Sequence, residues 1–226
     1  MNLFDVPQVT VPVSGTDEAF PVRRIYCIGR NYEEHVVEMG YDVKRSKPFY
    51  FAKPADAIVL SGGSAAYPPK TTDLHHEIEL VVAIGKRGRD VTVAEALDYV
   101  YGYAVGIDLT RRDLQRAAKE KARPWETAKG FDQSAPISPI HRVSETGHPE
   151  SGRIWLAVNE GIRQDADINE LIWNVAESVA ELSTLFELAP GDLLSTGTPA
   201  GVGPLKPGDR ITGGIEGIDE IEVSIA

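Results

Sequence analysis

A strand that opens with two acids constrains this chain more than any other feature. The stretch LHHEIELVVAIGKRG, residues 74–88, has the apolar composition of a buried strand. Successive side chains on a strand point to opposite faces, so Glu77 and Glu79 share one face. Two neighbouring carboxylates at the end of a buried strand repel each other and lose hydration, which costs roughly several kcal/mol for each unpaired ion. The pattern therefore predicts a positive group between them.

A divalent metal ion is one candidate for that positive group. Mg²⁺ and Mn²⁺ prefer carboxylate oxygens, and Glu77 and Glu79 offer two such ligands. Asp108 is the candidate for a third ligand, because it ends the otherwise apolar strand pattern YGYAVGID. The alternative is that these acids pair with Arg or Lys, or lie at a solvated edge. The spacing alone leaves both interpretations open.

A possible general base lies upstream, in residues 31–40. Asn31 and Glu34 predict the start of a short helix, and Gly40 predicts its end. His35 and Glu38 are three apart and therefore share one face. A carboxylate that accepts from one imidazole nitrogen fixes the tautomer and raises the basicity of the other nitrogen, as a general base requires. The alternative is a chance His/Glu pair on a partly exposed helix.

Other residues are candidates for binding an anion. Arg112 and Gln115 are three apart at the start of a predicted basic helix, and with Lys129 they could contact an anionic substrate. A solvated basic face is the alternative for that helix. The turn TGTPAGVGP at 196–204 has backbone N–H groups and hydroxyls that suit a carboxylate, although such a segment is often only a turn. Its candidate residues are Gly197 and Thr198.

The composition excludes several classes of function. A net charge of −11 argues against nucleic acid and against an anionic membrane surface. No apolar run approaches the roughly 20 residues of a membrane-spanning helix. The first residues lack the basic and apolar regions of a secretory signal, and the single cysteine, Cys27, fits a reducing compartment. We therefore expect a cytoplasmic protein that binds neither nucleic acid nor membrane.

The order of short apolar segments predicts the fold class. Many short strands, with helices that do not alternate regularly between them, favour a mixed, β-rich α+β fold. Residues 1–21 are polar and punctuated by proline, and we expect them to form an N-terminal arm before a single catalytic domain at 22–226. Residues 168–188 carry apolar side chains near helical spacing and predict the longest helix.

Six segments in this order resemble the fumarylacetoacetate hydrolase family, most strongly its acylpyruvate hydrolase branch, which includes fumarylpyruvate hydrolases. They are YCIGRNYEEHVVEMG, KPFYFAKP, LHHEIELVVAIG, YGYAVGIDLTRRDLQ, RPWETAKGFDQSAPISP and LLSTGTPAGVGP. The resemblance covers roughly residues 22–226. It implies a mixed β-roll with flanking short helices, a homodimer, and a metal-dependent hydrolase. The reaction implied is cleavage of a C–C bond in a 2,4-dioxo acid, above all fumarylpyruvate to fumarate and pyruvate.

The resemblance also implies a role for each candidate residue. It implies Mg²⁺ or Mn²⁺ on Glu77, Glu79 and Asp108. His35 with Glu38 would be the dyad that activates water, on a segment that orders over the bound substrate, and Lys129 would stabilise developing charge. The substrate's carboxylate and carbonyl oxygens would be held by Arg112, Gln115 and Thr198, with Gly197 in the same turn. The resemblance does not identify the residues that contact the acyl group beyond the 4-carbonyl, and the candidates for this are Arg30, Lys53 and residues 41–47.

Three other functions stay open at this point. Two lie on the same fold: an oxaloacetate decarboxylase, and a hydratase or isomerase of dienoic diacids. The His35–Glu38 pair favours hydrolysis, because direct decarboxylation needs no activated water. The third is a metal-stabilised binding protein without turnover, which the presence of both His35 and Lys129 disfavours. Acetylpyruvate, maleylpyruvate and oxaloacetate also remain possible substrates.

Overall fold

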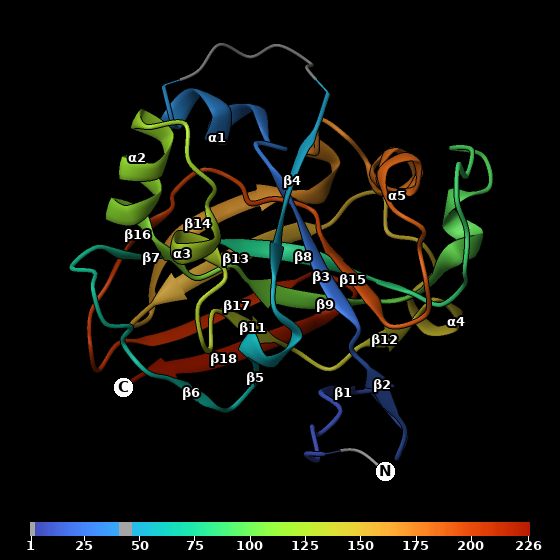
Figure 1. Ribbon diagram of the computed structural model, residues 1–226, viewed down its shortest axis with the longest axis horizontal. Coiled ribbons are helices and arrows are strands. Elements are labelled where there is room, and N and C mark those ends of the chain that lie inside the picture. Colours follow the sequence, from blue (N-terminus) through green and yellow to red (C-terminus); the bar gives the residue numbers. More distant parts are fainter. Residues whose placement is uncertain (1–2, 41–46) are drawn as a thin grey trace.

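The computed structural model describes residues 3–40 and 47–226. Its centre is an eight-stranded mixed sheet with strand order β4-β3-β15-β8-β9-β11-β5, in which β12 also pairs with β9 (Figure 1). The pairs β3–β15 and β5–β11 are parallel and the others are antiparallel. The strands are β3 (Arg24–Gly29), β4 (Phe49–Lys53), β5 (Ile58–Leu60), β8 (Ile78–Ile84), β9 (Val100–Ile107), β11 (Ala135–Ile137), β12 (His141–Arg142) and β15 (Asp192–Ser195).

Three smaller sheets complete the β-structure. The five-stranded sheet has the order β14-β13-β17-β18-β6, the three-stranded sheet has the order β10-β7-β16, and β1 pairs with β2. Their strands are β1 (Thr10–Pro12), β2 (Ala19–Pro21), β6 (Ser64–Ala65), β7 (Leu74–His76), β10 (Thr110–Arg111), β13 (Arg153–Val158), β14 (Gly161–Asp167), β16 (Gly203–Leu205), β17 (Arg210–Ile215) and β18 (Asp219–Ile225).

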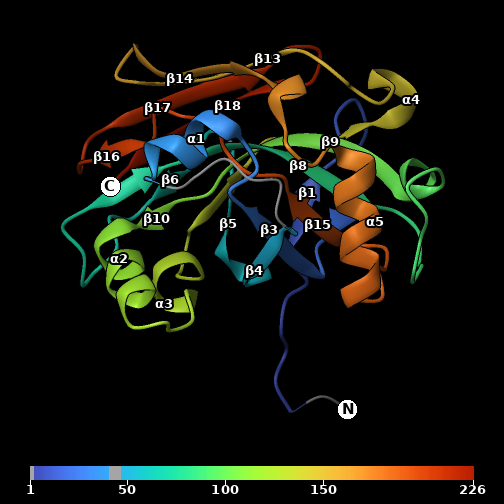
Figure 2. The same ribbon diagram turned by 90° about the horizontal axis from the view of Figure 1, so that it is seen from above.

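The helices are few and short. They are α1 (Glu33–Glu38), α2 (Arg112–Glu120), α3 (Glu126–Lys129), α4 (Val143–Thr146) and α5 (Val175–Leu185), with 3₁₀ turns at Ala55–Ala57, Ala96–Tyr99 and Ile168–Glu170. Figure 2 shows α2 with α3 on one flank of the sheets and α5 on the other. The predicted fold, a mixed β-roll of the α+β class with flanking short helices, is confirmed. None of the described helices is long and apolar enough to cross a bilayer.

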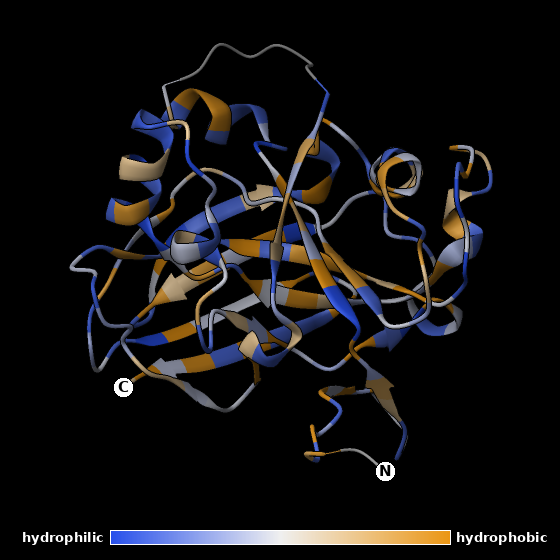
Figure 3. Cartoon of the chain, in the orientation of Figure 1, coloured by the Kyte–Doolittle hydropathy of each residue, from blue (hydrophilic) through white to orange (hydrophobic). Residues whose placement is uncertain are grey.

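The alternation of β8 divides the core in two. Its even-numbered side chains, such as Leu80 and Val82, join the larger core cluster, which includes residues of the five-stranded sheet and α5. Its odd-numbered side chains, such as Val81, join a second cluster with the β1–β2 hairpin, where Val11 and Phe20 are buried. Figure 3 shows the hydrophobic stretch of β8 in the middle of the molecule. The strand predicted from residue 74 onward is divided at Glu77, where the chain passes from β7 in one sheet to β8 in another.

The predicted starts of two helices are wrong: the one after Asn31 and the one at residue 168. The hydrogen bonds of Asn31 contribute to both differences. Helix α1 begins at Glu33 without a side-chain cap. The Asn31 amide instead donates to the backbone oxygens of Trp173 and Thr196, and its oxygen accepts from Trp173 N–H. Ile172 N–H donates to the Asn31 carbonyl, so the chain is non-helical there. The predicted helix at 168–188 therefore divides into a 3₁₀ turn and α5, which begins after a capping box of Asn174 and Glu177.

Candidate active site

Strand register brings three carboxylates together. Glu79 on β8 lies opposite Gly106 on β9, and Asp108 is two residues further along the β9 segment on the same face. Asp108 N–H donates to the Glu77 carbonyl at 2.8 Å, which fixes the third acid beside the first. One oxygen from each of Glu77, Glu79 and Asp108 lies within 4.8 Å of the others, and all three side chains are buried. The sheet thus assembles the predicted triad.

Cationic side chains neutralise two of the three acids. Lys129, at the end of α3, donates to Glu77 at 2.7 Å, to Asp108 at 2.6 Å and to Thr110 Oγ1 at 2.7 Å. Arg112 donates to the other oxygen of Glu77, and Lys53 forms an ion pair with Asp108 at 2.8 Å. Two of the acids, Glu77 and Asp108, therefore do pair with Lys or Arg, which was the alternative to a metal site. A carboxylate oxygen has two lone pairs, so these contacts do not exclude a metal ion.

Glu79 differs from its two neighbours. It accepts a hydrogen bond from Gly197 N–H at 3.0 Å, and no cationic side chain of the described residues forms an ion pair with it. Burial, with the charges of Asp108 and Glu77, raises its pKa well above the usual range for a carboxyl. Burial alone would also raise the pKa of Glu77, but Lys129 and Arg112 lower it. A buried carboxylate with no cationic partner, in a set of oxygen donors, fits a hard divalent cation.

The His35–Glu38 pair is formed as predicted. His35 Nδ1 donates to Glu38 Oε2 at 3.1 Å, and Gly201 N–H donates to Glu38 Oε1 at 3.1 Å. A carboxylate only accepts, so the hydrogen is on Nδ1, and in the neutral imidazole Nε2 has a lone pair. Burial alone would raise the pKa of Glu38, but the hydrogen bonds from His35 and Gly201 lower it. Glu38 thus stays ionised and fixes the tautomer that a general base needs.

The predicted anion-binding residues have clear local partners. Arg112 donates to Gln115 Oε1 at 2.7 Å, so the Gln115 NH₂ group is left to donate, since none of the described residues accepts from it. Gln164, buried on β14, donates to Thr198 Oγ1 at 2.8 Å and fixes that hydroxyl. Gly197 adopts φ +96°, and a Cβ there would approach the Asn31 Cβ to 2.8 Å. We expected the Gly197 N–H to contact the substrate, but it donates a hydrogen bond to Glu79 instead.

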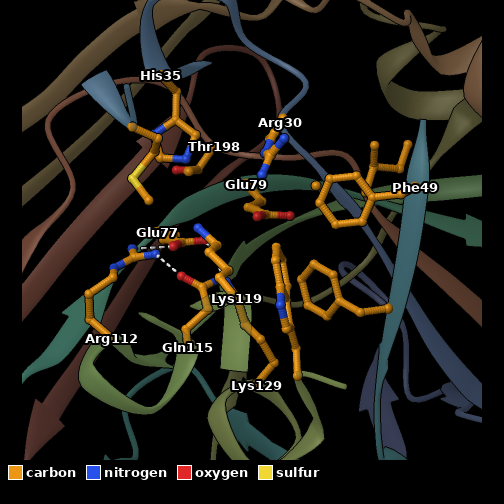
Figure 4. A pocket seen from close by; sticks show the side chains of 15 residues that line it. Arg30, His35, Phe49, Glu77, Glu79, Arg112, Gln115, Lys119, Lys129 and Thr198 are labelled. Carbon is orange, nitrogen blue, oxygen red and sulfur yellow. Dashed lines mark hydrogen bonds and ion pairs between the residues drawn. The ribbon is translucent and has the colours of Figure 1, made fainter. Parts of the chain in front are cut away.

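These groups surround one pocket (Figure 4). Of the predicted residues, those that line the pocket are Arg30, His35, Glu77, Glu79, Arg112, Gln115, Lys129 and Thr198. Glu38, Asp108 and Gly197 lie behind it and act on residues that line it.

Some residues in or around the pocket lie elsewhere than predicted or were not predicted at all. Lys53, considered for the acyl group, instead contacts Asp108 and the carbonyl of Leu109, away from the pocket lining. Gln164 is 0% exposed in a strand of polar sequence, GIRQDAD, which gives no signal for it. Lys119 and Trp125 also line the pocket. Residues 41–46, also considered for the acyl group, lie outside the described residues.

Comparison with known proteins identifies the family. Residues 24–226 match the model of the fumarylacetoacetate (FAA) hydrolase C-terminal domain. The chain belongs to the fumarylacetoacetate hydrolase family. The resemblance seen in the sequence is thereby confirmed over nearly the whole length.

Individual proteins of the family are similar to this chain over most of its length. The chain is 46% identical to a fumarylpyruvate hydrolase of a Ralstonia species over 189 residues, which cover 83% of this chain and 98% of that protein. It is 41% identical to a mitochondrial oxaloacetate decarboxylase of Dictyostelium discoideum, over 87% of this chain and 90% of that one. The crystal structure of fumarylpyruvate hydrolase from Pseudomonas aeruginosa, in complex with Mn²⁺ and pyruvate, superposes with a TM-score of 0.98 at 50% identity. It covers 100% of this chain and 99% of that chain.

Proposed function

We propose that this protein is a metal-dependent hydrolase that cleaves the C–C bond of an acylpyruvate, and that fumarylpyruvate is its substrate. The observation that carries the proposal is the His35–Glu38 dyad beside the pocket that the acidic residues also line. The dyad supplies a base for water, which hydrolysis needs and decarboxylation does not. The similarity to fumarylpyruvate hydrolases supports the choice of substrate.

The residues of this chain fit that reaction. Glu77, Glu79 and Asp108 would hold Mg²⁺ or Mn²⁺, which when bound acts as a Lewis acid toward negative charge on substrate oxygens. Arg112, Gln115 and Thr198 would bind the carboxylate and carbonyl oxygens of the 2-oxo acid. With the 2-oxo acid held there, the 4-carbonyl would lie toward His35, which lines the same pocket.

His35 would then move the proton. Its Nε2 lone pair accepts a proton from the water that attacks the 4-carbonyl, while Glu38 stabilises the imidazolium. The bond between C3 and C4 breaks, the electron pair remains on the pyruvate portion, and C3 takes up the proton that His35 received from water. Lys129 directs its N–H groups to Glu77, Asp108 and Thr110, so it acts through its charge. Its pKa, which burial alone would lower, is raised by Asp108 and Glu77, so that charge persists.

Oxaloacetate decarboxylation is the second candidate, because the Dictyostelium relative is 41% identical. Steady-state turnover of the Mn²⁺-loaded protein on fumarylpyruvate, acetylpyruvate and oxaloacetate separates the two. We expect the highest kcat/KM on fumarylpyruvate and its loss in His35→Ala. His141→Ala is the matched control, since His141 pairs with Asp219 and does not line the pocket. If oxaloacetate is the best substrate and His35→Ala retains its turnover, the protein is a decarboxylase.

We also propose that residues 22–226 form one catalytic domain, that the protein is a cytoplasmic homodimer, and that it binds neither nucleic acid nor membrane. The family resemblance supports the dimer, the net charge of −11 supports the lack of anionic partners, and the lone cysteine, Cys27, supports a reducing compartment. Light scattering coupled to size exclusion measures the mass in solution against the 24.6 kDa of one chain. A monomeric mass would contradict the dimer.

A further inference from the structure

Two cationic side chains of the pocket have no part in the mechanism above. Lys119 comes from α2 and Arg30 follows β3, and both line the pocket with Glu77 and Lys129 (Figure 4). Burial, together with the positive charges of Arg112 and Arg30, lowers the pKa of Lys119 to about 8. Lys119 therefore lies within the electrostatic field of both arginines, and the three basic groups act on one region of the pocket.

Aromatic rings join these two cations. The rings of Phe49 and Trp125 meet edge to face, with centroids 5.2 Å apart and planes at 90°. Arg30 Cζ lies 5.5 Å from the centre of the Phe49 ring, and Lys119 Nζ lies 5.1 Å from the centre of the Trp125 ring. Contacts of this kind hold a cation in place over an aromatic face. The result is an apolar wall with a basic group at each ring.

Positive side chains line the pocket beyond the part that would bind the 2-oxo acid. Of the described residues, four cationic side chains and two carboxylates line it: Arg30, Arg112, Lys119 and Lys129, with Glu77 and Glu79. Arg112 and Lys129 already contact Glu77, and Arg112 lies beside Gln115, where the 2-oxo acid would bind. Arg30 and Lys119 bring further positive charge beside the aromatic wall. A second anionic group on the same ligand could contact both of them.

We propose that Arg30 and Lys119 form a subsite for the distal carboxylate of a dicarboxylic acylpyruvate, whose planar unsaturated chain lies along Phe49 and Trp125. This inference rests on the proposed function and specifies its substrate class. An acylpyruvate with a neutral acyl group, such as acetylpyruvate, leaves the subsite empty. Arg30 and Lys119 thereby select for charge at the end of the substrate that does not react.

The first test is the ratio of kcat/KM for fumarylpyruvate to kcat/KM for acetylpyruvate, measured on the Mn²⁺-loaded protein. We expect Lys119→Met to lower this ratio about 10- to 100-fold, the range for loss of a hydrogen bond between charged groups. The change should be in KM for fumarylpyruvate, because the contact is far from the reacting bond. Lys119→Arg, which keeps the charge, should restore most of the ratio. Lys121→Met, an exposed lysine just past α2, should leave it unchanged. An unchanged ratio in Lys119→Met would overturn the subsite.

A binding measurement separates the subsite from the proposed function. The ligands 2-oxoheptanedioate and 2-oxoheptanoate have the chain length of fumarylpyruvate, lack a 4-carbonyl, and differ only in the distal carboxylate. In titration calorimetry with the Mn²⁺-loaded protein, we expect the diacid to bind about tenfold more tightly or better, and Lys119→Met to remove the difference. Equal affinities in the wild type would overturn the subsite. If the protein cleaves neither acylpyruvate, the hydrolase proposal fails, and these affinities still decide whether the subsite exists.

Discussion

Replacing Glu79 by Gln should change the stability of this protein in opposite directions with and without metal. Glu79 is 1% exposed and accepts one hydrogen bond, from Gly197 N–H. Gln has nearly the same size, and its amide oxygen can accept the same bond. Because the pKa of Glu79 is raised, the folded state keeps a proton on Glu79 at a pH where the unfolded chain does not, and Gln removes the free energy that this costs. In the metal-free protein we expect it to raise the free energy of unfolding by about 1–3 kcal/mol.

The same substitution should weaken the response to metal. For the wild type, Mn²⁺ at about 100 times its Kd stabilises the folded state by about 2.7 kcal/mol. For a chain of this size that corresponds to a rise in Tm of about 5–11 °C. Glu79→Gln loses a charged ligand, so at the same Mn²⁺ concentration most of this rise should disappear. The variant is thus more stable than the wild type in EDTA and gains less from Mn²⁺.

The assay is thermal unfolding of both proteins in EDTA and across a Mn²⁺ titration. Glu120→Gln is the matched control, because Glu120 is an exposed acid at the end of α2 and the substitution makes the same change of side chain there. Its unfolding curves should follow those of the wild type. If Glu79→Gln is no more stable than the wild type in EDTA and keeps the full Mn²⁺ shift, Glu79 is neither an unbalanced charge nor a ligand, and the reasoning fails.

Three further predictions concern the groups behind the pocket. Glu38→Gln should lower kcat on fumarylpyruvate about 10²- to 10³-fold in steady-state assays, with little change in KM, because the tautomer of His35 is no longer fixed. Gln164→Leu should lower the free energy of unfolding in urea by about 2–3 kcal/mol, because it leaves buried Ile78 N–H and His76 Nδ1 without their acceptor. Burial lowers the pKa of His76 to about 4. The unfolded state therefore binds the proton first as the pH falls, and urea unfolding should show about 2 kcal/mol less stability at about pH 5 than at pH 7.5. His76→Asn should reduce that difference, and an equal loss in the variant would contradict the assignment.

The sequence was informative where the signal is local. Alternation along β8 placed Glu79 on the face away from Leu80, and the strand pattern ending at Asp108 located the third acid. The i, i+3 spacing of His35 and Glu38 was sufficient to predict their contact. Each of these depends on residues close together in one element, where periodicity fixes direction.

Contacts between distant segments could not be predicted in this way. Lys53 pairs with Asp108 across 55 positions, and the polar strand containing Gln164 gives no hint that this one side chain is buried. Asn31 has the residue type of a helix cap, but it satisfies the backbone at Trp173 and Thr196 instead. A cap and a long-range bridge need the same amide, and only the packing of the chain decides which forms.

The ion pairs explain why Glu77, Glu79 and Asp108 differ in their electrostatic surroundings, although all three are acids at the ends of strands in the sequence. Glu77 and Asp108 each contact two cationic groups and share Lys129, so cationic side chains face both of them without any metal. Glu79 lies in the same low-dielectric surroundings with one backbone N–H as its partner. Whatever binds the triad therefore gains most of its electrostatic energy at Glu79, because its charge alone is not already balanced. A substitution at Glu77 or Asp108 would also leave Lys129, Arg112 or Lys53 buried without a partner and so confuse metal loss with a broken ion pair. Glu79→Gln breaks no ion pair, and for that reason its effects on stability and on metal binding can be read separately.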